Sequence, residues 1–382
     1  MTRSTVYGTR GRGTRLLATG AIVAFAALGL AACSKDKAAD TTVAPAAAAD
    51  TTVAATTETT AAAASDTTAA AATETTAAAA ADTTAAAAAA PAAAGAGITL
   101  AVNPWTGSAV NANVAKVILE SKLGTKTTLL PIDENATWPG LDNGSIDAVL
   151  EVWPSGHKTD FDTYVTQKKS VVDIGELGPK AKIGWYIPTA MLKDHPALAT
   201  WEGFKDAKDA KLFATAETGD QGQFLMGDPS YVSYDEQIIK NLNLPLKFVV
   251  AGSEAALITA IEGAVKDDKP LLLQFWQPHW LQSKVALTEV KLPDVSDACK
   301  ASIASKDGKY NCDYPIDVLY KAASVKLQAK NAAALAFLSK LQLTTDQQNT
   351  IAAYVDGDKM DPGAAAQKWV DANPDTVAGW LA

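Results

Sequence analysis

The chain has 382 residues, of which 33 are basic and 42 acidic, so its formal net charge at pH 7 is −9. That acidity disfavours nucleic acids and anionic membrane surfaces as partners, because both are negatively charged. The length suggests two domains, which must come from the last three quarters of the chain, since the first quarter is a leader followed by a low-complexity segment.

Residues 1–32 have the composition of a secretory signal peptide. They contain four arginines and no acidic residue, and the apolar run from Leu16 to Leu30 is too short to span a bilayer comfortably. The run ends in Leu30-Ala31-Ala32-Cys33, which resembles the lipobox of bacterial lipoproteins, in which the cysteine is lipidated and becomes the mature N-terminus. An ordinary signal peptide with a chance cysteine is the alternative. We expect an extracytoplasmic protein that Cys33 anchors to the outer face of the cell membrane.

Residues 33–97 form a low-complexity segment of alanine and threonine with scattered acidic residues. Asp-Thr-Thr recurs at Asp50, Asp66 and Asp82, and the segment has no aromatic residue. Such a composition buries too little apolar surface to fold. We expect a disordered tether that lets a globular body stand clear of the membrane. Loss of the leader removes four basic residues and no acidic one, which leaves a net charge of −13.

Two cysteines remain once Cys33 is set aside. Cys299 and Cys312 are spaced for a short loop, and an exported protein meets an oxidising compartment. We expect them to form a disulfide, worth roughly 3 kcal/mol in the chain-entropy model. The alternative is a metal site, but the sequence offers no nearby histidine or further cysteine as ligands.

From Ile98 onward the chain alternates between strand and helix patterns. Short apolar runs typical of strands lie at 98–103, 127–132 and 146–153, and helical patterns separate them at 114–123 and 136–141. The order returns with a strand at 246–250, a helix at 254–265 and a strand at 271–276. It predicts parallel, doubly wound sheets in two α/β lobes. We expect 98–182 to begin lobe I, 183–289 to form lobe II, and 290–382 to return to lobe I, mainly as helices.

Each lobe carries a tryptophan at the carboxyl end of a predicted strand, followed by proline and histidine. The two segments read Trp153-Pro154-Ser155-Gly156-His157 and Trp276-Gln277-Pro278-His279. Ligands of open α/β sheets bind in the crevice outside these strand ends. Trp105 also follows a strand, so three indoles are expected to face one cleft.

Several indoles in one cleft point to a quaternary ammonium ligand. Such a cation has no N–H to donate, but the negative faces of aromatic rings can surround it, each contributing about 0.5–2 kcal/mol. The alternative role of a tryptophan is in the hydrophobic core. We expect that role for tryptophans within helix or strand patterns, namely Trp138, Trp185, Trp201, Trp369 and Trp380.

Three stretches together resemble a known family. They are Trp105-Thr106, the stretch from Trp138-Pro139-Gly140-Leu141 through Glu151-Val152-Trp153-Pro154, and Phe275-Trp276-Gln277-Pro278-His279-Trp280. They resemble the OpuAC/ProX-type binding proteins of ABC transporters for glycine betaine, choline and proline betaine, over residues 98–382. The resemblance implies a two-lobed periplasmic-binding-protein-like fold of type II with the ligand cleft between the lobes. It also implies no enzymatic activity, no cofactor, a monomeric body, and permease and ATPase subunits as partners.

The resemblance further implies an aromatic box around a trimethylammonium group. Trp153 and Trp276 match box positions, and Trp105 matches one used in choline-type members. Tyr231, in the segment Gly227-Asp228-Pro229-Ser230-Tyr231, stands where some members have tryptophan.

The box leaves the rest of the ligand open between betaine and choline. For betaine, the resemblance implies a carboxylate clamp made by His157 and the backbone amides of Val232 and Ser233, with His279 as the second candidate histidine. Choline lacks a carboxylate, and Asp228 is the acid that would then serve. Because His157 fits the family pattern, the sequence slightly favours betaine.

Three other functions compete with this one. A secreted hydrolase would need a nucleophile with its base or a metal cluster, and the sequence contains no G-x-S-x-G, H-E-x-x-H or P-loop motif. A two-lobed binder of sugars or amino acids would also use an aromatic cleft. The tether is compatible with a surface adhesion protein.

Overall fold

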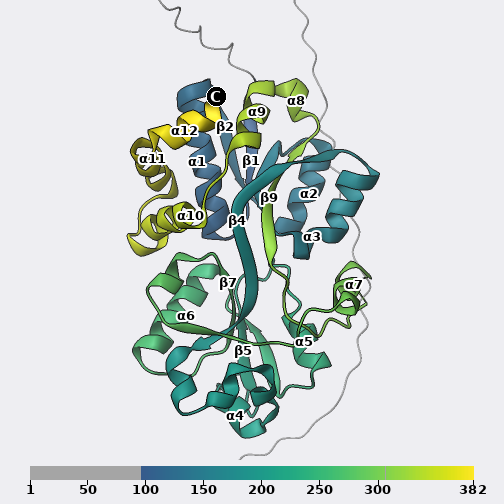
Figure 1. Ribbon diagram of the computed structural model, residues 1–382, viewed down its shortest axis with the longest axis vertical. Coiled ribbons are helices and arrows are strands. Elements are labelled where there is room, and N and C mark those ends of the chain that lie inside the picture. Colours follow the sequence, from purple (N-terminus) through teal and green to yellow (C-terminus); the bar gives the residue numbers. More distant parts are fainter. Residues whose placement is uncertain (1–95, 306) are drawn as a thin grey trace, which may run out of the picture. The chain divides into compact units, whose positions relative to one another are not determined.

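The computed structural model describes residues 96–305 and 307–382, and Figure 1 draws them as ribbons. They belong to one compact unit. The predicted signal peptide, the predicted lipidation site Cys33 and the predicted tether up to residue 95 lie outside the described residues. No helix in the described ranges has both the length and the apolar composition needed to cross a bilayer.

The first sheet begins with three parallel strands. They are β1 (Ile98–Val102), β2 (Thr127–Pro131) and β3 (Ala148–Val152), in the order β2-β1-β3. The helices that follow them are α1 (Thr106–Leu123), α2 (Glu134–Asn143) and α3 (Pro154–Asp160), with a π-helical turn at Phe161–Gln167. All five residues of β3 are buried, as expected for a parallel strand covered on both faces. The helix α1 ends at Gly124, whose φ of 61° is the left-handed conformation that glycine adopts without strain.

The second sheet repeats this pattern. It contains β5 (Gly222–Met226), β6 (Leu246–Val250), β7 (Leu273–Gln277) and β8 (Leu287–Val290). Its α-helices are α4 (Ala207–Lys211), α5 (Asp235–Asn241), α6 (Glu254–Lys266) and α7 (Asp297–Ser305). Short 3₁₀ turns lie at Thr189–Lys193, Pro196–Ala199, Trp201–Lys205 and Trp280–Ser283. The predicted strand at 246–250 and helix at 254–265 match β6 and α6 to within one residue.

One long strand connects the two sheets. β4 (Val171–Pro188) pairs with β9 (Asp317–Ser324) up to Ala181, and with β7 from Lys182 onward. Figure 1 shows it running through both halves of the molecule. We therefore call residues 96–181 and 317–382 lobe I, and residues 182–316 lobe II. The two sheets form one strand path, in the order β2-β1-β3-β9-β4-β7-β5-β6.

The return to lobe I begins later than the predicted residue 290. Residues from Val290 to Tyr314 pack into the core of lobe II, together with Trp185 and Phe224. Cys299 and Cys312 form the expected disulfide within this stretch. The chain re-enters lobe I as the strand β9, so the return is not wholly helical. Its helices are α8 (Leu327–Lys330), α9 (Ala332–Lys340), α10 (Thr345–Ala352), α11 (Pro362–Ala372) and α12 (Pro374–Leu381), with a π-helical turn at Ala353–Gly357.

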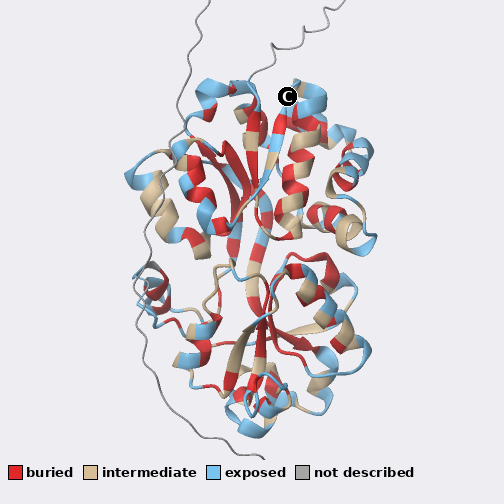
Figure 2. Ribbon diagram, turned by 180° about the vertical axis from the view of Figure 1, so that it is seen from behind, coloured by how far each residue is buried: buried red, intermediate tan, exposed pale blue. Residues whose placement is uncertain are grey.

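Buried residues concentrate on the strands and on the inward faces of the helices, as Figure 2 shows. The predicted core tryptophans Trp138, Trp185, Trp369 and Trp380 are all buried. Trp201 is only half-buried and carries Lys205 over its ring, with 4.1 Å from Nζ to the ring centroid. The architecture leaves the carboxyl ends of the strands of both lobes facing the region where β4 crosses.

Candidate functional site

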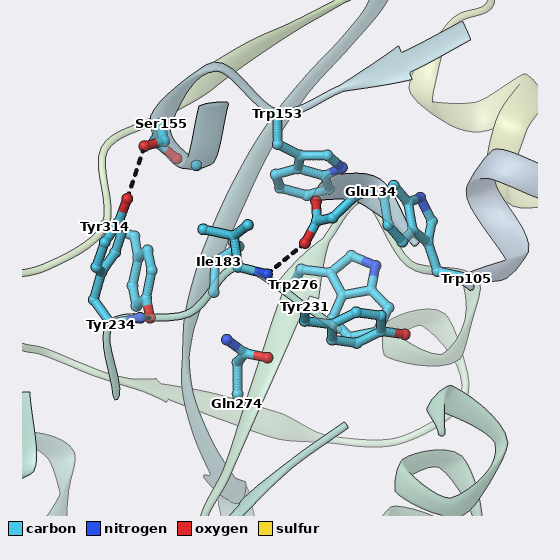
Figure 3. Close-up of a pocket in the computed structure, with 12 residues that line it drawn as sticks. Trp105, Glu134, Trp153, Ser155, Ile183, Tyr231, Tyr234, Gln274, Trp276 and Tyr314 are labelled. Carbon is cyan, nitrogen blue, oxygen red and sulfur yellow. Dashed lines mark hydrogen bonds between the residues drawn. The ribbon is translucent and has the colours of Figure 1, made fainter. Parts of the chain in front are cut away.

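A small cavity of about 50 Å³ lies between the two lobes, and Figure 3 shows its walls. Lobe I contributes Trp105, Glu134, Trp153, Ser155 and Gly156. The crossing strand contributes Ile183, and the rest of lobe II contributes Tyr231, Val232, Tyr234, Gln274, Trp276 and Tyr314. The predicted residues Trp105, Trp153, Tyr231, Val232 and Trp276 are thus brought together.

The strand ends position the indoles. Trp105 and Trp153 are the residues just before helices α1 and α3, and each follows a parallel strand of the same sheet. Their extended backbones turn the chain from strand to helix. Trp276 lies on β7 of the other lobe. The carboxyl ends of parallel strands meet at one edge of a sheet, which explains why residues distant in sequence converge here.

Tyr231 closes the aromatic cage from lobe II. Its ring lies edge-on to Trp105, with centroids 5.9 Å apart, and edge-on to Trp276, with centroids 5.7 Å apart. Its hydroxyl donates to the carbonyl oxygen of Pro104 in lobe I at 3.0 Å. Four aromatic side chains from two lobes therefore border one space, which suits a compact cation without N–H groups.

A buried carboxylate lies behind two of the indoles. Glu151 Oε1 accepts hydrogen bonds from Trp105 Nε1 at 2.7 Å and from Trp153 Nε1 at 3.1 Å. Its Oε2 accepts from Asn111 Nδ2 at 2.7 Å and from Gln348 Nε2 at 2.9 Å. Burial raises the pKa of Glu151 to about 7, although the hydrogen bonds from Trp105, Trp153 and Gln348 oppose that rise.

Sequence reasoning missed Glu134, a second carboxylate, which lines the cavity itself. It is the first residue of α2 and is only 7 % exposed. One oxygen accepts a hydrogen bond from the backbone N–H of Val232, and the other lies 2.9 Å from His157 Nε2. The sequence did contain a signal for Glu134. It follows the strand β2 and begins a helix, and such positions at the carboxyl ends of strands commonly contribute to ligand sites.

His157 does not line the cavity, contrary to its predicted place in a carboxylate clamp. Its Nε2 contacts Glu134, and its Nδ1 lies 3.0 Å from Asp160 Oδ2 and 3.1 Å from Trp138 Nε1. Burial opposes the charge on the ring, but the hydrogen bonds to Asp160 and Glu134 outweigh it and raise the pKa of His157 to about 9. Nε2 bonds directly to the carboxylate of Glu134, so the role of His157 is to hold Glu134.

Three other predicted residues also lie outside the cavity lining. Asp228 folds onto its own loop, where Oδ1 accepts from the backbone N–H of Ser230 at 2.9 Å. The hydroxyl of Ser233 donates to Asp235 at 2.6 Å. His279 Nε2 lies 3.0 Å from Glu254 Oε1, and its Nδ1 accepts from the backbone N–H of Leu281. These three side chains are used by the protein itself, whereas the prediction for Ser233 concerned its backbone amide.

A matching carboxylate is buried in lobe II. Asp235 Oδ1 accepts from Trp185 Nε1 at 2.7 Å and from the Tyr314 hydroxyl at 2.9 Å. Its Oδ2 accepts from Gln274 Nε2 at 2.9 Å and from the Ser233 hydroxyl. Burial raises the pKa of Asp235 to about 6. Asp235 thus supports Gln274 and Tyr314, which line the far side of the cavity.

Direct contacts join the lobes around the cavity. The backbone N–H of Thr106 donates to Glu254 Oε2 at 2.6 Å, Trp280 Nε1 donates to Asp356 Oδ2 at 2.9 Å, and the Tyr234 hydroxyl donates to the Ser155 carbonyl at 3.3 Å. The lobes are therefore closed over the site. Within residues 96–305 and 307–382, no group of three or more His, Cys, Asp or Glu side chains is arranged to hold a metal ion.

Comparison with known proteins gives a family match. Residues 96–372 match the family model of the substrate binding domain of the ABC-type glycine betaine transport system, OpuAC. A relative from Pelagibacter ubique (strain HTCC1062), named trimethylamine N-oxide-binding protein, is 27 % identical over 274 residues, which cover 70 % of this chain and 85 % of the relative.

Solved structures confirm the predicted fold class. Lactococcal OpuAC in its closed, liganded conformation with glycine betaine matches with a TM-score of 0.58 at 20 % identity, covering 75 % of this chain and 99 % of that one. An ABC-transporter choline binding protein in complex with choline matches with a TM-score of 0.60 at 18 % identity, covering 74 % and 91 %. At these identities the similarity establishes the two-lobed α/β fold.

Proposed function

Because the chain belongs to the OpuAC family of substrate-binding domains of ABC-type glycine betaine transport systems, we propose that its cavity binds a trimethylammonium cation without a carboxylate, of the choline type. Family membership makes the protein an extracytoplasmic binding component of an ABC importer for quaternary ammonium compounds, and not an enzyme. The choice of ligand within that class follows from the polar groups around the cage.

The observation that carries the proposal is the position of Glu134. Its carboxylate lines the cavity and takes the backbone N–H of Val232, one of the donors expected to bind the carboxylate of betaine. His157, a second of the three expected donors, is bonded to Glu134 and Asp160, which leaves the backbone amide of Ser233 as the third. A betaine carboxylate would therefore approach another carboxylate, whereas a hydroxyl such as that of choline donates to one.

The charge of the walls supports the same ligand. No lysine or arginine is among the described residues that line the cavity. Glu134 borders the space, and Glu151 lies directly behind Trp105 and Trp153. A net cation gains from both carboxylates, while a zwitterion gains at one end and loses at the other.

Trimethylamine N-oxide is the second candidate, because the relative from Pelagibacter ubique is named for binding it. It has the same three methyl groups, but its oxygen accepts hydrogen bonds and cannot donate. An oxygen that only accepts hydrogen bonds gains nothing from the carboxylate of Glu134, so Glu134 favours choline over trimethylamine N-oxide.

Calorimetry with choline, trimethylamine N-oxide and glycine betaine tests the proposal. Wild type should bind choline at least about tenfold more tightly than betaine, and Glu134→Gln should remove most of that difference by weakening choline. Glu262→Gln, on the exposed face of α6, is the matched control and should change neither affinity. A wild-type preference for betaine that survives Glu134→Gln would refute the assignment.

We also propose that lipid on Cys33 anchors the protein to the outer face of the membrane and that residues 34–95 tether the body there. The sequence Leu30-Ala31-Ala32-Cys33 supports this, although it lies outside the described residues. Cys33→Ser should release the protein from the membrane fraction. Retention of the variant there would contradict the anchor.

A further inference from the structure

We propose that Glu151 is a positioning residue: its carboxylate fixes Trp105 and Trp153 as a pair and makes the cage prefer a cation over a neutral ligand of the same shape. The inference rests on the proposed function only in that the cage binds a trimethylammonium group. It does not depend on which such ligand is bound.

The hydrogen bonds of Glu151 set the orientation of both indoles. Trp105 and Trp153 come from two different strand ends, yet both N–H groups donate to the same oxygen, Oε1, at 2.7 and 3.1 Å. An indole has one N–H, at its edge, so that bond fixes the rotation of the ring. The single oxygen therefore determines how two walls of the cavity present their faces.

The surroundings of Glu151 are built for the ionised form. All four partners are N–H groups, and the two amides leave their own oxygens, Asn111 Oδ1 and Gln348 Oε1, without hydrogen-bond partners. A buried oxygen without a hydrogen-bond partner costs free energy. The donation of both amide N–H groups to the carboxylate must offset that cost. Gly107 makes the approach possible, since a Cβ there would lie 2.8 Å from Glu151 Oε2 and 2.7 Å from Gln348 Nε2.

An anion in this position strengthens the cage in two ways. Its charge attracts a cation across the rings in a poorly solvated interior. A hydrogen bond from the indole N–H to a carboxylate also polarises the ring, and a more negative face attracts a cation more strongly. A neutral ligand of the same size gains from neither effect. The charge of Glu151 should therefore increase the ratio of the affinity for the cation to the affinity for the neutral ligand.

The test uses Glu151→Gln in the full chain with choline and its neutral carbon analogue, 3,3-dimethyl-1-butanol. The glutamine oxygen still accepts both indoles, and both Asn111 and Gln348 can turn their unpaired oxygens toward the new amide, so the fold should survive. We expect choline to weaken by about tenfold or more while the analogue changes by less than about twofold. Near-ultraviolet circular dichroism and thermal melting verify the fold.

Asp235→Asn is the matched control, because Asp235 is equally buried and accepts four side-chain hydrogen bonds in the other lobe. It should leave the ratio of the two affinities unchanged. Equal weakening of choline and the analogue by Glu151→Gln would overturn the proposal, and so would no change in either.

Failure of the choline assignment would be recognised separately, by a wild-type preference for betaine. In that case the same comparison is made with glycine betaine and its carbon analogue 3,3-dimethylbutanoate. The ratio of their affinities then tests Glu151 in the same way, because only the trimethylammonium charge differs between the two ligands.

Discussion

Each lobe buries a carboxylate near the cavity, and the two serve different purposes. Glu151 in lobe I and Asp235 in lobe II are 3 % and 0 % exposed, and each accepts four side-chain hydrogen bonds. In both cases burial is the main reason that the pKa is raised, to about 7 and about 6. By burial and number of bonds alone the two sites would be judged equivalent.

The partners distinguish them. Both indoles bonded to Glu151 line the cavity, whereas the indole bonded to Asp235, Trp185, is fully buried against Phe224 with ring centroids 4.6 Å apart. Two partners of Asp235 are hydroxyls, which can turn and accept a hydrogen bond from the protonated acid, while every partner of Glu151 is an N–H donor. The same chemistry thus holds two cage indoles in lobe I, and in lobe II a core indole together with Gln274 and Tyr314 on the far side of the cavity.

The largest effect expected from this comparison comes from removing one indole in each lobe. Trp153→Ala should weaken choline by at least about thirtyfold, since a cage wall is lost, and should lower stability less than its counterpart. Trp185→Ala should lower the free energy of unfolding by about 3–5 kcal/mol, because it opens a large space in the core of lobe II. Calorimetry and denaturant unfolding of both variants measure the two effects.

A clear separation of the two variants supports the division between cage and core. Trp369→Ala, which breaks a stacked pair with Trp380 in lobe I, is the control and should resemble Trp185→Ala. Similar losses of affinity in all three variants would show that the indoles have no separate roles.

The parts of this site that were predictable from sequence are those carried by local pattern. The Trp-Pro motif of Trp153 and the strand pattern before it predicted the indole at a strand end, and parallel strands bring such ends together. A similar pattern predicted Trp276, whereas Tyr231 was identified through the family resemblance. All three line the cavity.

The parts that were missed depend on which polar groups pair across the chain. Glu134 and His157 are 23 residues apart, and the motif around His157 gives no sign that Glu134 takes its Nε2. Likewise, β9 follows a segment that contains the Cys299–Cys312 disulfide. It pairs with β4, from which it is separated in sequence by about half the length of the folded body. Non-local pairing of this kind leaves little trace in a single sequence.

The pH dependence of binding should also separate the two carboxylates. A cation favours ionised Glu151, so choline affinity should be constant above about pH 8 and fall by up to roughly tenfold per unit well below pH 7. The carboxylates of Glu134, Glu254 and Asp356 lie near the same cage. Glu151→Gln should remove the part of the pH profile that Glu151 causes, whereas Asp235→Asn should leave the profile intact.

Acidification should stabilise the empty protein, whereas it should weaken the binding of choline. The pKa values of Glu151 and Asp235 are higher in the folded chain than in the unfolded one, so the folded state binds more protons as the pH falls from about 7 toward 5. The raised pKa of His157 acts in the same direction above pH 6.5. The melting temperature should thus rise on mild acidification while choline affinity falls. A parallel fall of both would contradict the assignment.

The smallest effects should come from removing one hydrogen-bond donor from each carboxylate. Gln348→Met deletes a donor to Glu151 and keeps the length of the side chain, so the anion is less stabilised and the affinity for choline should fall by about threefold to tenfold.

Ser233→Ala deletes the hydroxyl bonded to Asp235 and should cost about 1–2 kcal/mol of unfolding free energy, with choline affinity within about twofold of wild type. Ser233→Ala keeps the backbone amide that the sequence suggested for the site, so only the side chain is tested. If affinity fell more in Ser233→Ala than in Gln348→Met, the carboxylate of lobe II and not that of lobe I would control the cage.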